Sequence, residues 1–141
     1  MKQTDTYKRK ITRLLRSHGI TPTAQRVKIA HTMLSRPQHL SADQLLVLTN
    51  KTGKIASKAT VYNTLGLFAQ KGLIRELVVD PKRTFYDSST HPHHHFYNSD
   101  THELSDITDN QVEVSIQGEL PPGTEIDNVE VIIHLRSEKE S

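Results

Sequence analysis

Residues 57–70, SKATVYNTLGLFAQ, predict the helix around which the rest of the fold is arranged. Ser57 is a residue type that commonly caps a helix, and Val61, Leu65 and Phe68 recur at helical spacing as one apolar stripe. The opposite face is polar and suits base edges and phosphates. Its candidate DNA contacts are Lys58, Thr60, Tyr62, Asn63 and Thr64. An ordinary amphipathic surface helix shows the same pattern, so this stretch alone leaves both interpretations open.

Three further amphipathic stretches precede this helix. Residues 7–18, 23–36 and 41–50 each show the hydrophobic period of a helix, and Gly19 and Pro37 provide stop signals after the first two. Thr23 is predicted to cap the second of these stretches, and Ser41 and Gln44 have the spacing of a capping box. Residues 38–40 are predicted to form a turn. The order of these helices is that of a helix-turn-helix domain.

A short hairpin is predicted after the last helix. Residues 73–79 and 83–86 are rich in β-branched and aromatic side chains, and an Asp80-Pro81-Lys82 turn joins them. Helices followed by such a hairpin make a winged helix. Arg26, Lys82 and Arg83 are basic and predicted to be exposed, so they join the candidate DNA contacts.

The charge of the chain is divided near residue 86. Residues 1–86 hold 16 Lys and Arg against 4 Asp and Glu, whereas residues 87–141 hold 2 against 12. A basic half that carries a helix-turn-helix pattern is typical of nucleic-acid binding. The alternative is a basic domain that merely offsets an acidic one.

The composition excludes several classes of protein. The 141 residues include no Cys, which excludes a disulfide, a Cys-ligated zinc and a cysteine nucleophile. No apolar run reaches the length of a membrane span. The first ten residues are basic but lack the apolar segment of a secretory signal. We therefore expect a cytoplasmic protein with no membrane partner.

The second half is predicted to be mainly β. Strands are expected over residues 95–97, 103–107, 111–117 and 126–135, with a break at Pro121-Pro122-Gly123. About fifty residues bury little core on their own, so we expect this half to form a homodimer. The predicted fold class is α+β. Its parts are a winged-helix domain (1–86), a hinge (87–92), a small, mainly β, α/β dimerisation domain (93–136) and an acidic tail (137–141).

A histidine-rich stretch, Asp87-Ser-Ser-Thr-His-Pro-His-His-His95, joins the two halves. Imidazole and carboxylate groups together are ligands for divalent transition metals. In an extended strand His93 and His95 share one face and His94 points away. A remnant of a purification tag or a solvated surface run are the alternatives, but the stretch is internal and a carboxylate flanks it.

Taken together, these stretches resemble the ferric uptake regulator family of metal-sensing bacterial repressors. The resemblance is carried by residues 19–26 (GITPTAQR), 39–43 (HLSAD), 59–65 (ATVYNTL) and 93–96 (HHHF). It implies a homodimer that binds palindromic double-stranded DNA operators, with Tyr62 contacting bases. It also implies one regulatory metal site formed by His39, Asp87, His93, His95 and Asp106.

The chain departs from the family pattern at two metal sites. Asn98 and Thr101 stand where most members have a cysteine pair, so no structural Cys-ligated zinc is expected. At a further site Pro92 and Val129 stand where histidine is usual. The side chains that remain as candidates for a second metal or haem are His91, His94 and Glu113.

The branch within the family is indicated by two details. Residues 121–136 resemble the iron response regulators, and Asp87 with its six-residue step to His93 resembles the peroxide-sensing members. The resemblance therefore implies control of iron homeostasis, of peroxide stress, or of both. In the peroxide-sensing case, peroxide acting on an Fe²⁺ site would destroy a ligand such as His39 or His93.

The expected mechanism follows from the positions of the ligands along the chain. One ion bound by His39, Asp87 and the ligands of the second half would tie the two domains together and couple metal to DNA affinity. A nitrogen and oxygen site without thiolate suits Fe²⁺ or Mn²⁺, and Zn²⁺ would also bind in vitro. The alternatives are a haem-responsive regulator that uses residues 93–95 and a metal-dependent enzyme. No general base or nucleophile accompanies the ligands, so an enzyme is not expected.

Overall fold

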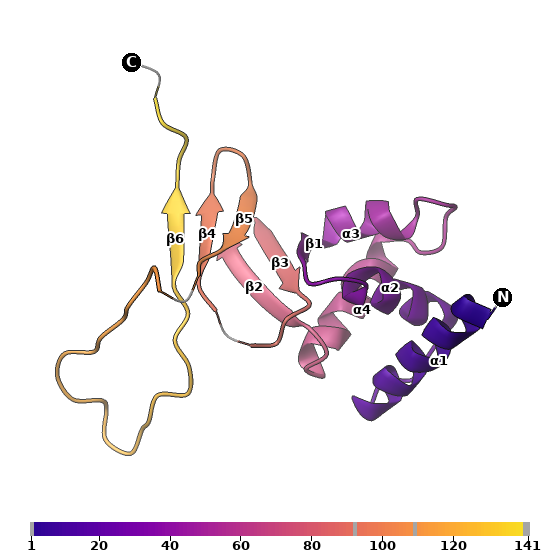
Figure 1. Cartoon of the computed structure of the whole chain (residues 1–141), viewed down its shortest axis with the longest axis horizontal. Coiled ribbons are helices and arrows are strands. Elements are labelled where there is room, and N and C mark those ends of the chain that lie inside the picture. Colours follow the sequence, from indigo (N-terminus) through magenta and orange to yellow (C-terminus); the bar gives the residue numbers. More distant parts are fainter. Residues whose placement is uncertain (1, 92, 109, 140–141) are drawn as a thin grey trace. The chain divides into compact units, whose positions relative to one another are not determined.

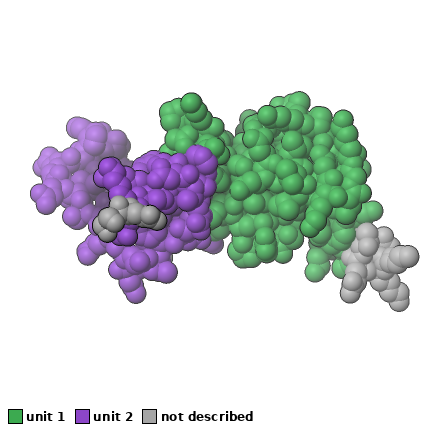
Figure 2. Space-filling model, turned by 90° about the horizontal axis from the view of Figure 1, so that it is seen from above, with its two compact units in different colours: residues 1–90 green, residues 91–141 purple. Residues whose placement is uncertain are grey.

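The computed structural model describes residues 2–91, 93–108 and 110–139, with side chains from residue 6 onward (Figure 1). The expectation for Pro92 and the last two residues of the predicted acidic tail, 140–141, fall outside the described residues. The chain divides into two compact units, residues 1–90 and 91–141, which Figure 2 colours separately. Each unit is described by itself. Among the described residues no helix is both long enough and apolar enough to traverse a bilayer.

Unit 1 begins with four helices, and their ends follow local sequence signals. They are α1 (Lys2–Ser17), α2 (Ala24–Leu34), α3 (Ala42–Thr49) and α4 (Lys58–Gln70). Thr23 Oγ1 and Ser57 Oγ accept hydrogen bonds from backbone N–H groups of α2 and α4. Ser41 and Gln44 make the reciprocal bonds of a capping box. The helix caps predicted from the sequence are therefore confirmed.

The core of unit 1 lies where these helices meet (Figure 1). Leu15 of α1, Met33 of α2, Leu45 of α3 and Phe68 of α4 are each fully buried. Burial of a side chain of this size stabilises a fold by about 1.5–3 kcal/mol. The inward stripe of α4 is thus held by the three other helices, which leaves its opposite face free for a ligand.

A three-stranded antiparallel sheet completes unit 1, in the order β1-β3-β2. The strands are β1 (His39–Ser41), β2 (Arg75–Asp80) and β3 (Arg83–Asp87). The hairpin of β2 and β3 confirms the predicted wing. The turn predicted over residues 38–40 is wrong in part, because His39 and Leu40 form an edge strand on β3. Three residues are too short for alternation to reveal a strand, and the partner is more than forty residues away.

Unit 2 contains a second three-stranded sheet, in the order β5-β4-β6. Its strands are β4 (His95–Asn98), β5 (Glu103–Asp106) and β6 (Ile132–Leu135). β4 pairs antiparallel with β5 through a short turn and parallel with β6. The long connection from β5 to β6 meets the requirement that parallel strands have a crossover.

Two strand predictions in unit 2 are wrong. Residues 111–117 form no strand, and of residues 126–135 only the last four join the sheet. Within the described residues 110–131 the chain follows an irregular path and most of its apolar side chains are exposed, as Ile116 and Ile126 illustrate. An alternating sequence becomes a strand only when a sheet edge is available to accept its backbone hydrogen bonds.

Candidate functional site: nucleic-acid interface and metal ligands

The exposed face of α4 carries most of the predicted DNA contacts. Lys58, Tyr62 and Asn63 are exposed, and Thr60 is half-buried beside the N-terminal cap. The predicted DNA contact of Thr64 needs correction, because the side chain of Thr64 is buried, with 6% exposure. Position 64 is three residues after Val61, so it falls on the inward side of the helix. A buried hydroxyl at this position cannot reach a base edge.

The other basic candidates lie on α2 and on the wing. Arg26 donates from Nη1 to the carbonyl of Thr21 at 2.9 Å, which holds its side chain at the start of α2. Lys82 is exposed in the turn between β2 and β3, where its N–H donates to Asp80 Oδ1 at 2.7 Å. Arg83 follows as the first residue of β3 and is half-buried. The wing turn therefore presents positive charge on a defined backbone.

A contact that the sequence did not indicate links α3 to the exposed face of α4. Tyr62 donates its hydroxyl hydrogen to Asp43 Oδ1 at 3.1 Å. Lys58 Nζ lies 3.8 Å from the same oxygen and 5.7 Å from the centre of the Tyr62 ring. Burial, followed by the hydrogen bond and the charge of Asp43, raises the pKa of Tyr62. The phenol therefore remains a hydrogen-bond donor at neutral pH.

Unit 1 brings two of the predicted metal ligands together. His39 on β1 is the register partner of Asp87 on β3, and residues directly opposite in an antiparallel pair project from the same face. Asp87 is buried and accepts a hydrogen bond from the N–H of Ser89 at 2.8 Å. The backbone and hydroxyl of Ser88 bond to Gln38 and extend the pairing beyond the strand ends.

Unit 2 brings together the other three. His95 on β4 is the register partner of Asp106 on β5, and its Nε2 lies 3.2 Å from Asp106 Oδ1. His93 Nε2 lies 3.0 Å from the same carboxylate oxygen. The rings of His93 and His95 are 4.3 Å apart between centroids. Two imidazoles and one carboxylate thus converge, as the alternation of the sequence predicted for the two histidines.

The orientation of the His93 ring is set by the backbone. Its Nδ1 lies 2.8 Å from the carbonyl oxygen of His91, which can only accept a hydrogen bond. Nδ1–H therefore donates to this carbonyl, and Nε2 is left to face Asp106, where it donates to the carboxylate as N–H or, with that proton removed, can ligate a cation. Metal-ligating histidines typically donate their second ring N–H to such an acceptor. His93 and Asp106 are therefore arranged as two ligands of one cation.

His94 has a structural contact that the sequence did not suggest. Its Nδ1 accepts a hydrogen bond from the N–H of Val131 at 2.9 Å, and its carbonyl accepts one from Ile107. With Nδ1 used as an acceptor, the proton of the neutral ring lies on Nε2, so neither nitrogen offers a lone pair to iron. His94 thus joins the start of β4 to the segment before β6, and its role at a second metal or haem stays a prediction.

The remaining second-site candidates are spread over exposed positions of unit 2. His91 contributes its carbonyl to His93, and Glu113 is exposed in the irregular connection. Asn98 and Thr101 occupy a turn in which Asn98 Oδ1 accepts hydrogen bonds from the N–H groups of Asp100 and Thr101. The amide side chain of Asn98 thus shapes the turn at the two positions where the family pattern has a cysteine pair.

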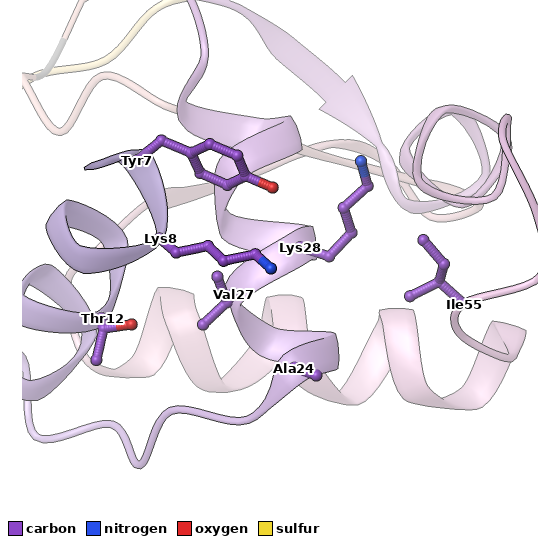
Figure 3. Close-up of a pocket in the computed structure, with 7 residues that line it drawn as sticks. All are labelled: Tyr7, Lys8, Thr12, Ala24, Val27, Lys28 and Ile55. Atoms are coloured by element: carbon purple, nitrogen blue, oxygen red, sulfur yellow. The ribbon is translucent and has the colours of Figure 1, made fainter. Parts of the chain in front are cut away.

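A separate hollow in unit 1 lies between α1, α2 and the loop before α4 (Figure 3). Its volume is about 410 Å³. The walls are formed by Tyr7, Lys8, Thr12, Ala24, Val27, Lys28 and Ile55. Two ammonium groups at an apolar wall add to the positive charge of this unit.

Comparison with known proteins gives a family and a fold. The family model described as the ferric uptake regulator family matches residues 17–134. The peroxide-responsive repressor PerR of Staphylococcus aureus (strain Mu50) is 33% identical over 81 residues, which cover 57% of this chain and 55% of that protein. PerR of Staphylococcus saprophyticus is 32% identical over the same length. The chain therefore spans about half the length of the curated relatives it matches.

Solved structures show the same architecture. The ferric uptake regulator of Pseudomonas aeruginosa, determined with manganese, superposes with a TM-score of 0.68 at 22% identity, covering 91% of this chain and 98% of that chain. The ferric uptake regulator of Vibrio cholerae superposes with a TM-score of 0.71 at 21% identity, covering 89% and 98%. These likenesses establish the predicted α+β fold.

Proposed function

This chain belongs to the ferric uptake regulator family, and from that premise we propose that it is a metal-responsive, DNA-binding transcriptional regulator. The observation that carries the proposal is the division of the ligand residues between the two units. Unit 1 places His39 opposite Asp87 on the sheet of its DNA-binding domain. Unit 2 places His93, His95 and Asp106 with ligand atoms within 4.8 Å of one another.

The donor set fits a divalent first-row metal. Imidazole nitrogens and carboxylate oxygens without thiolate suit Fe²⁺ or Mn²⁺, and Zn²⁺ also accepts them. When bound, the cation would supply the positive charge that offsets the ligand carboxylates. The His91 carbonyl holds His93 in the tautomer that presents Nε2, and strand pairing holds His95 opposite Asp106. The protein thus fixes the orientation of its donors before any ligand arrives.

We further propose that the His39 and Asp87 pair completes the site formed by unit 2. Ligands contributed by both units would make metal affinity depend on the arrangement of the DNA-binding unit. Because coupling is reciprocal, DNA that favours the same arrangement would tighten metal binding by the same factor. Metal would therefore act on DNA binding without touching α4.

We propose that the operator is palindromic and that the protein binds it as a homodimer. Two copies of α4 related by a twofold axis would enter successive major grooves, roughly 34 Å apart. The apolar side chains exposed along unit 2, such as Val114, Ile116 and Ile126, suit burial against a second copy. A symmetric dimer is the most common assembly that provides such a partner.

The signal is proposed to be iron, peroxide or both. The relatives from Staphylococcus are named peroxide-responsive repressors, whereas the solved structures from Pseudomonas aeruginosa and Vibrio cholerae are named ferric uptake regulators. Hydrogen peroxide added to the Fe²⁺-loaded and Mn²⁺-loaded protein separates the two responses. Release of DNA only from the Fe²⁺-loaded form identifies a peroxide sensor, and unchanged binding in both identifies a sensor of metal alone.

Metal and operator titrations of three histidine variants test the proposed function. The operator is first selected from a randomised duplex library by the unmodified protein in Mn²⁺. His93→Ala should weaken Mn²⁺ binding by more than about 100-fold and abolish the DNA response, because it removes an oriented ligand. His39→Ala should weaken Mn²⁺ binding by only about tenfold and still abolish the response, because unit 2 keeps its three ligands.

His18→Ala is the matched control, since His18 directly follows the last residue of α1 and its Nδ1 bonds to the carbonyl of Leu14. It should leave both titrations unchanged. A His39→Ala protein whose operator binding still responds to Mn²⁺ as the unmodified protein does would show that metal does not act through a ligand on unit 1.

A further inference from the structure

Asp43 places a negative charge on the face of unit 1 that carries the proposed DNA contacts. It is one of 4 acidic residues among residues 1–86, which hold 16 Lys and Arg. Its carboxylate accepts the Tyr62 hydroxyl at 3.1 Å and lies 3.8 Å from Lys58 Nζ. Lys58 and Tyr62 are one turn apart on α4, so a single carboxylate engages two neighbouring side chains of the exposed face.

A purely structural role does not explain this position. An acidic residue in the first turn of α3 interacts favourably with the helix dipole, but any exposed site in that turn would provide the same benefit. The ion pair with Lys58 is exposed on both sides, with 68% of each side chain accessible, and exposed pairs contribute little to stability. A carboxylate near DNA phosphates also weakens binding through repulsion.

We propose that Asp43 is a specificity-determining residue of the DNA interface, which positions Tyr62 for its base contact and, through its charge, lowers the affinity for DNA of any sequence. This inference rests on the proposed function. A tyrosine has few rotatable bonds, so one hydrogen bond at the end of its ring fixes the direction of the whole side chain. The ring then meets the groove in one orientation and does not have to be ordered by the DNA.

The charge of Asp43 acts in the opposite direction on unspecific binding. Affinity for DNA of any sequence comes mainly from cations that neutralise phosphates. Asp43 repels phosphate and also engages Lys58, which reduces this contribution. Because phosphates line DNA of every sequence, this loss applies to the operator and to other sequences alike. The ratio of specific to unspecific affinity therefore depends on the positioning of Tyr62, while the charge of Asp43 sets the overall strength of binding.

Three single variants separate the positioning of Tyr62 from the charge of Asp43. The affinity of each is measured for the selected operator and for a scrambled duplex of equal length. Asp43→Ala removes both acceptor and charge, and should lower the operator-to-scrambled affinity ratio by about tenfold. Tyr62→Phe removes only the donor and should lower the ratio by a similar factor. Asp43→Asn keeps an acceptor oxygen and should retain most of the ratio while binding scrambled DNA more tightly. Its salt dependence should steepen by about one released counterion, from Lys58.

The double variant Asp43→Ala with Tyr62→Phe tests whether the two residues act through one contact. Its ratio should equal that of either single variant, because the hydrogen bond is already lost in each. Additive losses would overturn the proposal, as would an unchanged ratio in Asp43→Ala. Glu76→Gln is the matched control, since it removes one exposed charge from the same unit, and it should leave the ratio unchanged.

Two further measurements keep the result interpretable. Thermal unfolding of each variant should remain close to that of the unmodified protein, because Asp43 and Tyr62 are exposed. Failure of the unmodified protein to prefer any sequence in the library would overturn the proposed function together with this inference. A clear preference that survives Asp43→Ala would overturn this inference alone.

Discussion

The two units of this protein differ in how much apolar core they bury. Unit 1 has a continuous apolar core to which all four helices contribute, with Leu15, Leu65 and Phe68 fully enclosed. In unit 2 the buried apolar side chains among the described residues are Tyr97, Leu104 and Ile107. Unit 2 has in addition a connection of more than twenty residues, from β5 to β6, in which several apolar side chains are exposed, Ile116 and Ile126 among them.

The difference indicates where regulation can act. A domain with a complete core has one stable arrangement, whereas a small sheet with exposed apolar residues gains stability from whatever binds to it. The proposed metal ligands His93, His95 and Asp106 lie on the weakly packed unit. A modest binding energy therefore has its largest effect on the unit that is least stable alone.

A matched pair of leucine substitutions tests this contrast directly and should give the largest effect. Leu65→Ala in unit 1 should destabilise its unit by about 4 kcal/mol, because the enclosed cavity cannot collapse. Leu104→Ala in unit 2 should cost only about 2 kcal/mol, since fewer neighbours surround it. Hydrogen exchange along a urea series reports each unit separately. Equal losses in the two units would contradict the difference in packing.

Addition of metal should reduce the contrast. Mn²⁺ at about 100 times its dissociation constant should stabilise the protein by roughly 2.7 kcal/mol. If ligands come from both units, exchange should slow in both sheets. In His39→Ala the slowing should be confined mainly to unit 2. Protection limited to residues 93–106 in the unmodified protein would show that unit 2 binds the metal alone.

The exposed apolar residues of unit 2 should matter for assembly rather than for folding. Ile116→Asp should weaken the proposed homodimer by about 1.5–3 kcal/mol, which is the value of burying such a side chain against a partner. Analytical ultracentrifugation over a concentration series measures the change. Val78→Asp is the control, because Val78 is equally exposed but lies on the wing of unit 1. Equal dissociation by both variants would argue against an interface at residues 111–117.

The smallest effect should appear in the pH dependence of unit 1. Burial, and then the charge of Lys28, lowers the pKa of His31, whose ring stacks on Tyr7 at 3.9 Å. The unfolded chain therefore binds a proton more readily than the fold, and stability should fall as the pH drops through 6.5 and below. Urea unfolding at several pH values measures this slope. His31→Gln should flatten it, and an unchanged slope would assign it to other groups.

The sequence alone was sufficient wherever a feature depends on neighbours along the chain. The caps Thr23, Ser41 and Ser57, the apolar stripe of α4 and the wing hairpin were all predicted, because helix and hairpin signals lie within a few residues of one another. The shared face of His93 and His95 follows from strand alternation in the same way. The division of charge near residue 86 and the family resemblance were also inferred from the sequence alone.

Only the tertiary structure decided the features that depend on distant partners. The pairing of His39 with Asp87 and the contact of Asp43 with Tyr62 join residues far apart in sequence. Residues 111–117 alternate like a strand yet form none among the described residues of this chain, because a strand requires an edge to pair with. Periodicity states which face of an element is apolar, whereas the fold determines what that face meets.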